Sequence, residues 1–186
     1  MAAAAAETIK IVNGVRPEQL GDPTLCTEWD VRTLLNHIIL WTAYSAEQRA
    51  YGGSVAEELM NKDFAASPGF AADYAKQAGK AVTAWSDPAA WERDLGVMGS
   101  PMPAANVAAL LIAEYVLHGW DLATATGQRY HCDDAVAAVV LDTVRAQGDL
   151  FRQYKGFADV VEVPADAATY DKALAESGRD PASSTP

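Results

Sequence analysis

Glu114 and His118 have the residue types and the spacing of a metal site. They are four residues apart in the stretch AEYVLHGWDLA, so on a helix both side chains can reach a single ion above one face. At 100° per residue that face also carries leucines, which should turn it toward the interior of the protein. Because a lone buried carboxylate is costly, the glutamate needs a partner or a metal there.

Asp121 lies on the same predicted face, one turn after His118. An alternative interpretation of the cluster is structural. Glu114 and His118 would then form only a hydrogen-bonded pair, and Asp121 would support or cap the helix.

His37 strengthens the metal interpretation. It lies beside the apolar stripe of an earlier predicted helix, in line with Trp41 and Tyr44. A histidine there is commonly a core or boundary residue, but helical bundles build metal sites from inward side chains on facing helices. Two imidazoles and one carboxylate form the His₂Glu set of catalytic zinc, which leaves one coordination position open. The remaining histidine, His131, precedes Cys132 in a polar turn and is predicted to be a surface residue.

The elements that must position these residues are predicted to be helices. Apolar periodicity and stop signals predict helices over residues 1–12, from an N-cap at Thr27 to about residue 53, and over 70–85, 104–125, 133–154 and 167–177. Residues 91–103 are predicted to be a connection, and strand signals are almost absent. The predicted fold is all-α, a bundle of about four main helices with short peripheral ones. It forms a single domain over residues 1–177, followed by a flexible tail over 178–186.

Composition and charge exclude several classes of function. The chain has 186 residues, 50% of them hydrophobic, and a net charge of -11, so one globular core with an acidic surface is expected. Such a surface repels phosphate backbones and anionic headgroups, and no stretch approaches the roughly 20 apolar residues of a membrane span. Without a secretory signal, we expect a cytoplasmic protein, monomer or homodimer, whose partner is a small molecule rather than nucleic acid or membrane. Cys26 and Cys132 form no C-x-x-C pair; two free thiols are predicted, with a disulfide between them as the alternative.

Two stretches resemble the motifs of a known family. PTLCTEWDVRTLLNH (23–37) and AEYVLHGWDLATATG (113–127) are similar to the two motifs of the mycothiol-dependent maleylpyruvate isomerase N-terminal domain family, within the DinB-like superfamily. VEVPADA and GRDP near the C-terminus more weakly resemble an actinobacterial-type subgroup of metal-binding proteins. The resemblance implies a DinB-like four-helix bundle in which His37, Glu114 and His118 bind one divalent metal. It also implies supporting positions for three residues: Trp29, Trp120 and Asp121, the last of which could orient His118.

The predicted function is that of a metal-dependent enzyme acting on a small, partly apolar molecule. Zinc is the expected metal, with nickel or another divalent ion as the alternative, and mycothiol is the expected co-substrate of a transferase or isomerase reaction. The alternatives are a non-catalytic metal- or metabolite-binding protein, a metal-dependent hydrolase, and an enzyme of secondary metabolism. No general base is predicted.

The chain departs from the family pattern in one respect. The isomerase uses an arginine on the helix between the two motifs, where this chain has Lys76 and Lys80. Lysine cannot reproduce the bidentate grip of arginine on a carboxylate, which points away from maleylpyruvate itself as the substrate. Four residues are candidates for the pocket wall, with plain core packing as the alternative for each: Met98, Met102, Trp41 and Tyr44.

Overall fold

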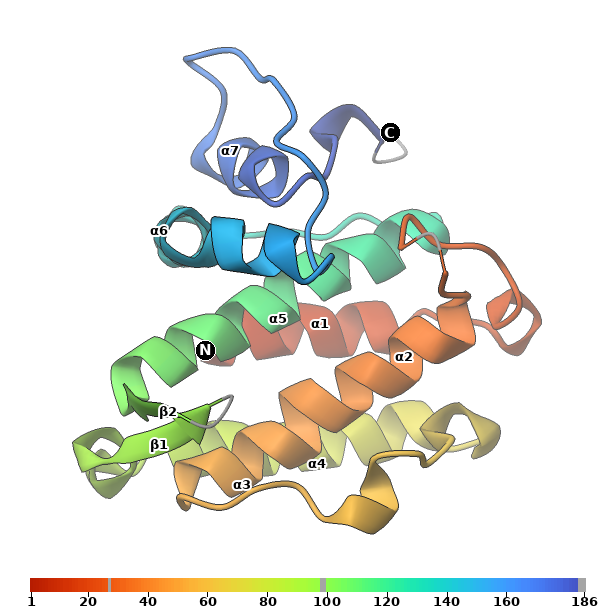
Figure 1. The fold of residues 1–186 in the computed structure, drawn as a ribbon. Helices are drawn as coiled ribbons and strands as arrows, with labels where there is room; N and C mark the ends of the chain where they lie inside the picture. The colour runs from red at the N-terminus through yellow and green to blue at the C-terminus, as the bar shows by residue number, and fades with distance from the viewer. Residues whose placement is uncertain (27, 98–99, 184–186) are drawn as a thin grey trace.

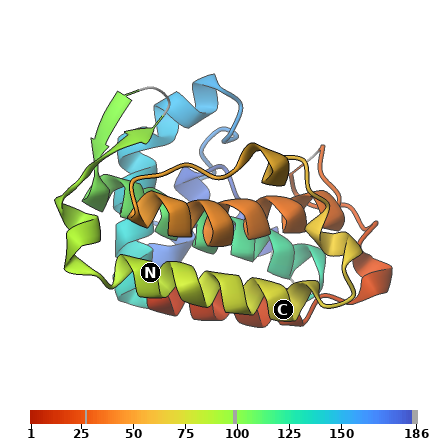
Figure 2. The same ribbon diagram turned by 90° about the horizontal axis from the view of Figure 1, so that it is seen from below.

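Four helical segments form a bundle in the computed structural model, which describes residues 1–26, 28–97 and 100–183 (Figure 1). The segments are α1 (Ala2–Asn13), a continuous run of α2 (Val31–Ile39), a π-helix (Leu40–Ser45) and α3 (Ala46–Ala50), then α4 (Phe70–Trp85) and α5 (Ala104–Ala125). Helix α5 packs on α1 and α2, and α4 packs on α1, α3 and the π-helix, which closes the ring. Figure 2 shows α1 and α4 side by side below the run that begins with α2. The all-α prediction is confirmed.

Two further helices lie outside the bundle. Helix α6 (Asp134–Gln153) packs on α5, and α7 (Thr169–Glu176) packs on α6 at the top of Figure 1. Short 3₁₀ turns complete the described helical structure: Pro17–Gln19, Glu57–Leu59, Phe64–Ala66, Pro88–Glu92 and Pro181–Ser183.

Helix α5 is the central helix of the protein. By length and composition it could cross a membrane, but 67% of its most apolar stretch is buried inside the protein. A helix that is apolar nearly all round suits a position surrounded by other helices, and α5 contacts α1, α2 and α6. Most of its residues therefore face other parts of the protein, while Glu114 keeps 34% of its side chain exposed.

Helix α2 begins later than predicted. Its N-cap is Asp30, whose side chain accepts a hydrogen bond from the backbone N–H of Thr33 at 2.8 Å, as an N-cap carboxylate does. The predicted cap, Thr27, lies outside the described residues. The predicted apolar stripe is confirmed, since Leu34 and Ile38 are fully buried.

The predicted connection over residues 91–103 contains a β-hairpin, so that prediction was wrong. Strands β1 (Asp94–Val97) and β2 (Ser100–Pro103) pair antiparallel, with Leu95 opposite Met102, and both pack on α5. Strands of four residues are too short to show alternation. The prolines of β2 are tolerated because both strands of a two-stranded sheet are edge strands.

The predicted flexible tail over 178–186 is not loose at its start. The side chain of Arg179 is only 10% exposed and pairs with Asp121 of α5, and Pro181–Ser183 form a 3₁₀ turn. The ion pair holds the start of the segment against the folded protein.

Candidate metal centre

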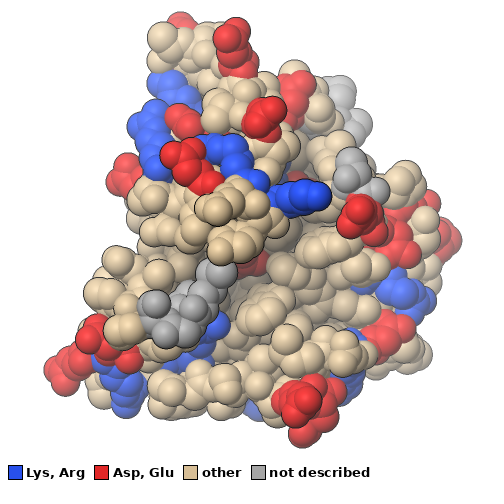
Figure 3. All heavy atoms as spheres, in the orientation of Figure 1, with Lys and Arg blue, Asp and Glu red and all other residues tan. Residues whose placement is uncertain are grey.

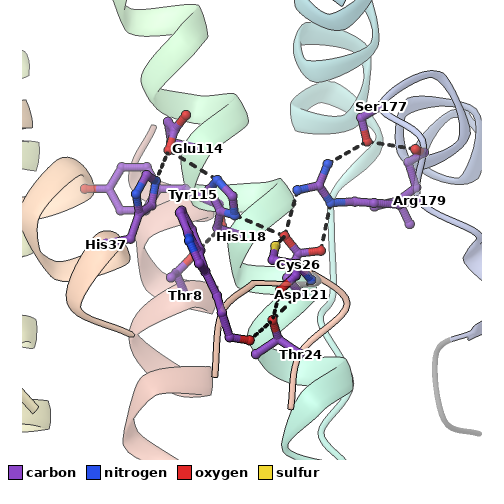
Figure 4. A network of polar contacts seen from close by, with 12 residues as sticks. Thr8, Thr24, Cys26, His37, Glu114, Tyr115, His118, Asp121, Ser177 and Arg179 are labelled. Atoms are coloured by element: carbon purple, nitrogen blue, oxygen red, sulfur yellow. Dashed lines mark hydrogen bonds and ion pairs between the residues drawn. The ribbon is translucent and has the colours of Figure 1, made fainter. Parts of the chain in front are cut away.

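His37 of α2 and Glu114 and His118 of α5 meet where the two helices pack (Figure 4). One carboxylate oxygen, Glu114 Oε2, lies 3.0 Å from His37 Nε2 and 3.7 Å from His118 Nε2. The three ligand atoms all lie within 4.8 Å of one another. Donors around a tetrahedral zinc are about 3.3 Å apart, so small side-chain rotations would close the set. Within the described chain, no fourth His, Cys, Asp or Glu joins this group.

Aromatic rings pack against the two imidazoles. The rings of His37 and His118 meet edge to face, with centroids 4.6 Å apart. The ring of Trp29 lies 4.8 Å from His37 and 6.0 Å from His118, and that of Trp41 lies 6.2 Å from His37. Trp29, a supporting position by resemblance, therefore packs against both candidate ligands.

Asp121 determines which nitrogen of His118 faces the centre. His118 Nδ1 lies 3.0 Å from Asp121 Oδ2, and because an ionised carboxylate only accepts, Nδ1 carries a proton. The opposite nitrogen, Nε2, then faces Glu114. A carboxylate behind a histidine in this way is the usual arrangement for a metal-ligating imidazole. Asp121 itself is 1% exposed.

Two further residues complete the surroundings of Asp121, and the sequence interpretation missed both. Arg179 donates from Nε to Oδ1 at 2.8 Å and from Nη2 to Oδ2 at 2.7 Å. The Cys26 thiol lies 3.5 Å from Oδ2. Arg179 follows the short helix α7, where no periodicity marks it, and the resemblance of GRDP was the available signal. Cys26 and Cys132 are both free, so the disulfide alternative is wrong.

Charge pairing shifts the pKa values of these groups strongly. Burial alone would raise the pKa of Glu114, but the His37 hydrogen bond and the charge of His118 lower it to about 2. Burial would lower the pKa of His118, but Asp121, Cys26 and Glu114 raise it to about 10. Burial would raise the pKa of Asp121, but Arg179 and His118 together keep it well below its ordinary value. Without a metal the centre is thus a cluster of paired charges.

The candidate ligands can be reached from outside. The Glu114 side chain is 34% exposed, and Figure 3 shows a hollow in this face of the molecule with an acidic side chain on its floor. A small molecule could therefore reach an ion bound at this position.

The other predicted site residues have mixed outcomes. Trp41 lies near His37, but Tyr44 stacks on Phe64, with ring centroids 5.2 Å apart, beside a separate small cavity. Met102 packs against a separate group of buried apolar side chains beneath the hairpin, not against the centre. Met98 lies outside the described residues. His131 is confirmed as a surface residue: its side chain is 76% exposed and lies 3.4 Å from Asp133.

The comparisons with known proteins identify the family of the chain. A family model described as the mycothiol maleylpyruvate isomerase N-terminal domain matches residues 1–123, a range that holds the candidate ligands and Asp121 but not Arg179. Two uncharacterized proteins of Mycobacterium tuberculosis, from strains CDC 1551 / Oshkosh and ATCC 25618 / H37Rv, are each 28% identical over 171 residues, which is 91% of this chain and 90% of each relative. No solved structure matches the chain significantly.

Proposed function

Because the chain belongs to the mycothiol maleylpyruvate isomerase N-terminal domain family, whose all-α DinB-like fold it has, we propose that it is a metal-dependent enzyme acting on a small molecule. His37, Glu114 and His118 are the proposed ligands of one divalent metal, and zinc is the metal that two imidazoles and a carboxylate suit best. A thiol, mycothiol in the first instance, is the proposed co-substrate.

The observation that carries this proposal is that three ligand atoms lie within 4.8 Å of one another. One of them is on the His118 ring, whose orientation Asp121 fixes. A hydrogen-bonded pair of Glu114 and His118 alone would not need His37 on the same oxygen at 3.0 Å. It would also not need Asp121 to direct His118 Nε2 toward that oxygen. Each of these features is what a metal ligand set requires.

The accessibility of the centre favours catalysis over a purely structural role. A structural zinc site closes with a fourth protein ligand, whereas a catalytic one keeps a position for water or substrate. The described residues supply three donors, and Glu114 is partly exposed. A divalent metal bound here would act as a Lewis acid that lowers the pKa of a thiol or of water.

The protein's own residues would prepare the centre for that chemistry. Asp121 holds the Nδ1 proton of His118 and so presents Nε2. Trp29 packs against both imidazoles and Trp41 packs near His37, so these rings cover part of the surroundings of the centre. Their rings offer an apolar wall to a substrate that is partly apolar.

The charge distribution argues for a substrate other than maleylpyruvate. Lys76 and Lys80 are both exposed on α4, a helix that packs against α1, α3 and the π-helix. Neither reproduces an arginine fork aimed at a dicarboxylate. We therefore propose thiol-dependent chemistry on a less acidic small molecule.

Metal content tests the ligand assignment. Purified protein should contain close to one zinc per chain, and His37→Ala, Glu114→Ala and His118→Ala should each lose it, since each removes one of three ligands. Elemental analysis after dialysis measures this. His131→Ala is the matched control and should keep its zinc, because this histidine is exposed and lies beside Asp133 rather than beside the candidate ligands. Equal metal in the wild type and all three ligand variants would disprove the assignment.

Thiol binding separates the enzyme from a binding protein. With cobalt in place of zinc, addition of mycothiol, or of N-acetylcysteine as a simpler probe, should change the visible absorption, because the ligand field responds to a new sulfur donor. An unchanged spectrum would favour a non-catalytic metal-binding protein.

A further inference from the structure

We propose that Arg179 is a positioning residue of the candidate metal centre. It lies after residue 123, beyond the part of the chain that the family model matches. It fixes Asp121, and through Asp121 the ring of His118. This inference rests on the proposed function, because it concerns the affinity of the same centre for its metal.

The contacts form a single chain from the C-terminal segment to the ligand. Arg179 grips both oxygens of Asp121, at 2.8 and 2.7 Å, and its Nη1 donates to Ser177 Oγ at 3.0 Å. Asp121 in turn accepts from His118 Nδ1 at 3.0 Å. Figure 4 shows these side chains in one continuous row that ends at Glu114 and His37. A bidentate arginine–carboxylate pair has a fixed plane, so it sets the orientation of the carboxylate that His118 must meet.

Burial makes this pair necessary rather than incidental. Asp121 is 1% exposed and Arg179 is 10% exposed, and in the described chain Arg179 is the only Lys or Arg side chain paired with Asp121. Removing one member of a buried pair leaves the other charge without compensation. Without Arg179, the carboxylate would be held only by His118 and by the weak thiol donor of Cys26, and it could rotate away from Nδ1.

The local sequence aims Arg179 at α5. Helix α7 ends in a Schellman motif, with the N–H of Gly178 bonded to Ala175 O and the N–H of Arg179 bonded to Leu174 O. Gly178 has a φ of +81°, and a Cβ there would lie 2.8 Å from the backbone of Ala158. The sequence SGR therefore turns the chain sharply at the end of α7, and this turn presents Arg179 to Asp121.

The consequence is that the metal centre depends on residues beyond the matched range of 1–123. The ligands come from α2 and α5, while the side chain that fixes Asp121 behind His118 is supplied 58 residues after Asp121. The segment after α6 thus contributes a residue to the centre in addition to packing on the outside of the bundle.

The test is a zinc competition titration on the full-length protein. Replacing an outer carboxylate or its partner commonly costs about 10- to 100-fold in metal affinity, and we expect a loss of that size for Arg179→Met. Arg152→Met is the matched control: Arg152 also ties α6 to the end of α7, through Glu176 O at 3.0 Å, but it does not touch Asp121. Far-UV circular dichroism of both variants checks that they fold. Wild-type affinity in Arg179→Met, or an equal loss in Arg152→Met, would overturn the proposal.

A double-mutant cycle tests whether Arg179 acts through Asp121. In an Asp121→Asn background the Arg179→Met substitution should change zinc affinity by much less than it does alone, because neighbouring groups in one network are not additive. Long-range ¹H–¹⁵N NMR of the His118 ring gives an independent readout. The zinc-loaded wild type should carry its proton on Nδ1, and Arg179→Met should weaken or lose that signal while Arg152→Met retains it. Additive losses with an unchanged ring signal would overturn the proposal.

A second variant covers the case in which Arg179→Met does not fold. Arg179→Lys keeps the buried charge but not the two-point grip, and we expect an intermediate loss of zinc affinity; wild-type affinity here would overturn the proposal. The two hypotheses fail differently. If the wild type binds no metal the proposed function is wrong, whereas if it binds metal and Arg179 variants bind equally, only this inference is wrong.

Discussion

The carboxylate of Asp121 gathers hydrogen bonds from three parts of the chain. His118 lies one turn before it on α5, Cys26 comes from the loop before α2, and Arg179 comes from the C-terminal segment. An almost fully buried carboxylate is costly unless it is paired and hydrogen-bonded, and here the pairing also orients a candidate ligand. One residue thereby links the stability of the fold to the geometry of the centre.

At the residue scale, zinc affinity should rise with pH. The pKa of His118 is raised to about 10, so at neutral pH the metal-free ring carries protons on both nitrogens. Zinc needs Nε2 free, so binding must release a proton, and the affinity should increase by up to about tenfold per pH unit below that pKa. Competition titrations from about pH 6.5 to 8.5 measure the slope.

The exposed histidine provides the control for this pH dependence. His131→Ala should show the same slope as the wild type, since its ring lies at the surface beside Asp133. A pH-independent zinc affinity in the wild type would mean that His118 is already neutral in the metal-free protein, contrary to the charge cluster described above.

At the element scale, the π-helix explains why part of the predicted pocket wall was misplaced. An α-helix would align His37, Trp41 and Tyr44 along one face, but a π turn adds a residue and shifts the face of everything after it. Tyr44 consequently packs on Phe64, away from the centre. The segment is secured by the hydroxyl of Tyr115, which donates to the backbone carbonyl of Thr42.

The close packing of α5 against Thr8 of α1 and against Tyr130 depends on Gly119 having no side chain. A Cβ there would lie 2.3 Å from the buried ring of Tyr130 and 3.1 Å from Thr8 Oγ1. We expect Gly119→Ala to lower the free energy of unfolding by about 1–3 kcal/mol, the usual cost of overpacking. Urea denaturation gives the value.

Gly79→Ala is the matched control for that prediction. Gly79 lies inside α4, and a Cβ there would meet nothing within 4 Å. Because alanine favours a helix over glycine, this variant should be more stable than the wild type by about 0.5–1 kcal/mol. Equal stability changes in the two variants would show that Gly119 is not held by close packing.

At the scale of the whole molecule, α6 and α7 are bound to the bundle by both apolar packing and the Arg179 pair. Helix α7 packs on α6, α6 packs on α5, and Arg179 reaches back to α5 directly. The C-terminal third should therefore unfold together with the bundle as one cooperative unit.

The distribution of tryptophan tests this cooperativity. All five tryptophans lie between residues 29 and 120, so none lies in α6 or α7 and their fluorescence reports mainly on the bundle. Leu174→Ala, in α7, removes a side chain that is 1% exposed and should cost about 2–5 kcal/mol. If the unit is cooperative, the tryptophan transition in urea shifts by the full amount.

The control for this experiment is Leu150→Ala in α6, whose side chain is 41% exposed. It should change stability by no more than about 0.5 kcal/mol. A tryptophan transition that Leu174→Ala leaves in place, while circular dichroism shows earlier loss of helix, would instead indicate that the C-terminal helices unfold separately.

The sequence by itself determined where the main helices lie and, in α4 and α5, their limits and internal geometry. The limits of α4 and α5 coincide with those predicted, over 70–85 and 104–125, because apolar period and stop signals act locally. The spacing of Glu114, His118 and Asp121 followed in the same way, since a helix fixes the relative position of residues three and four apart. Within α5, the candidate site could therefore be predicted from spacing alone.

Only the tertiary structure decided which groups meet across helices. The contact of His37 with Glu114 joins residues 77 apart, and that of Arg179 with Asp121 joins residues 58 apart. Such distances depend on how the whole core packs, and a single charged residue in a polar segment carries no periodic signal. His37 was a candidate from its residue type and its place beside the apolar stripe, and the resemblance pointed to it as well. Arg179, with the thiol of Cys26 beside it, was recognised only once the chain was folded.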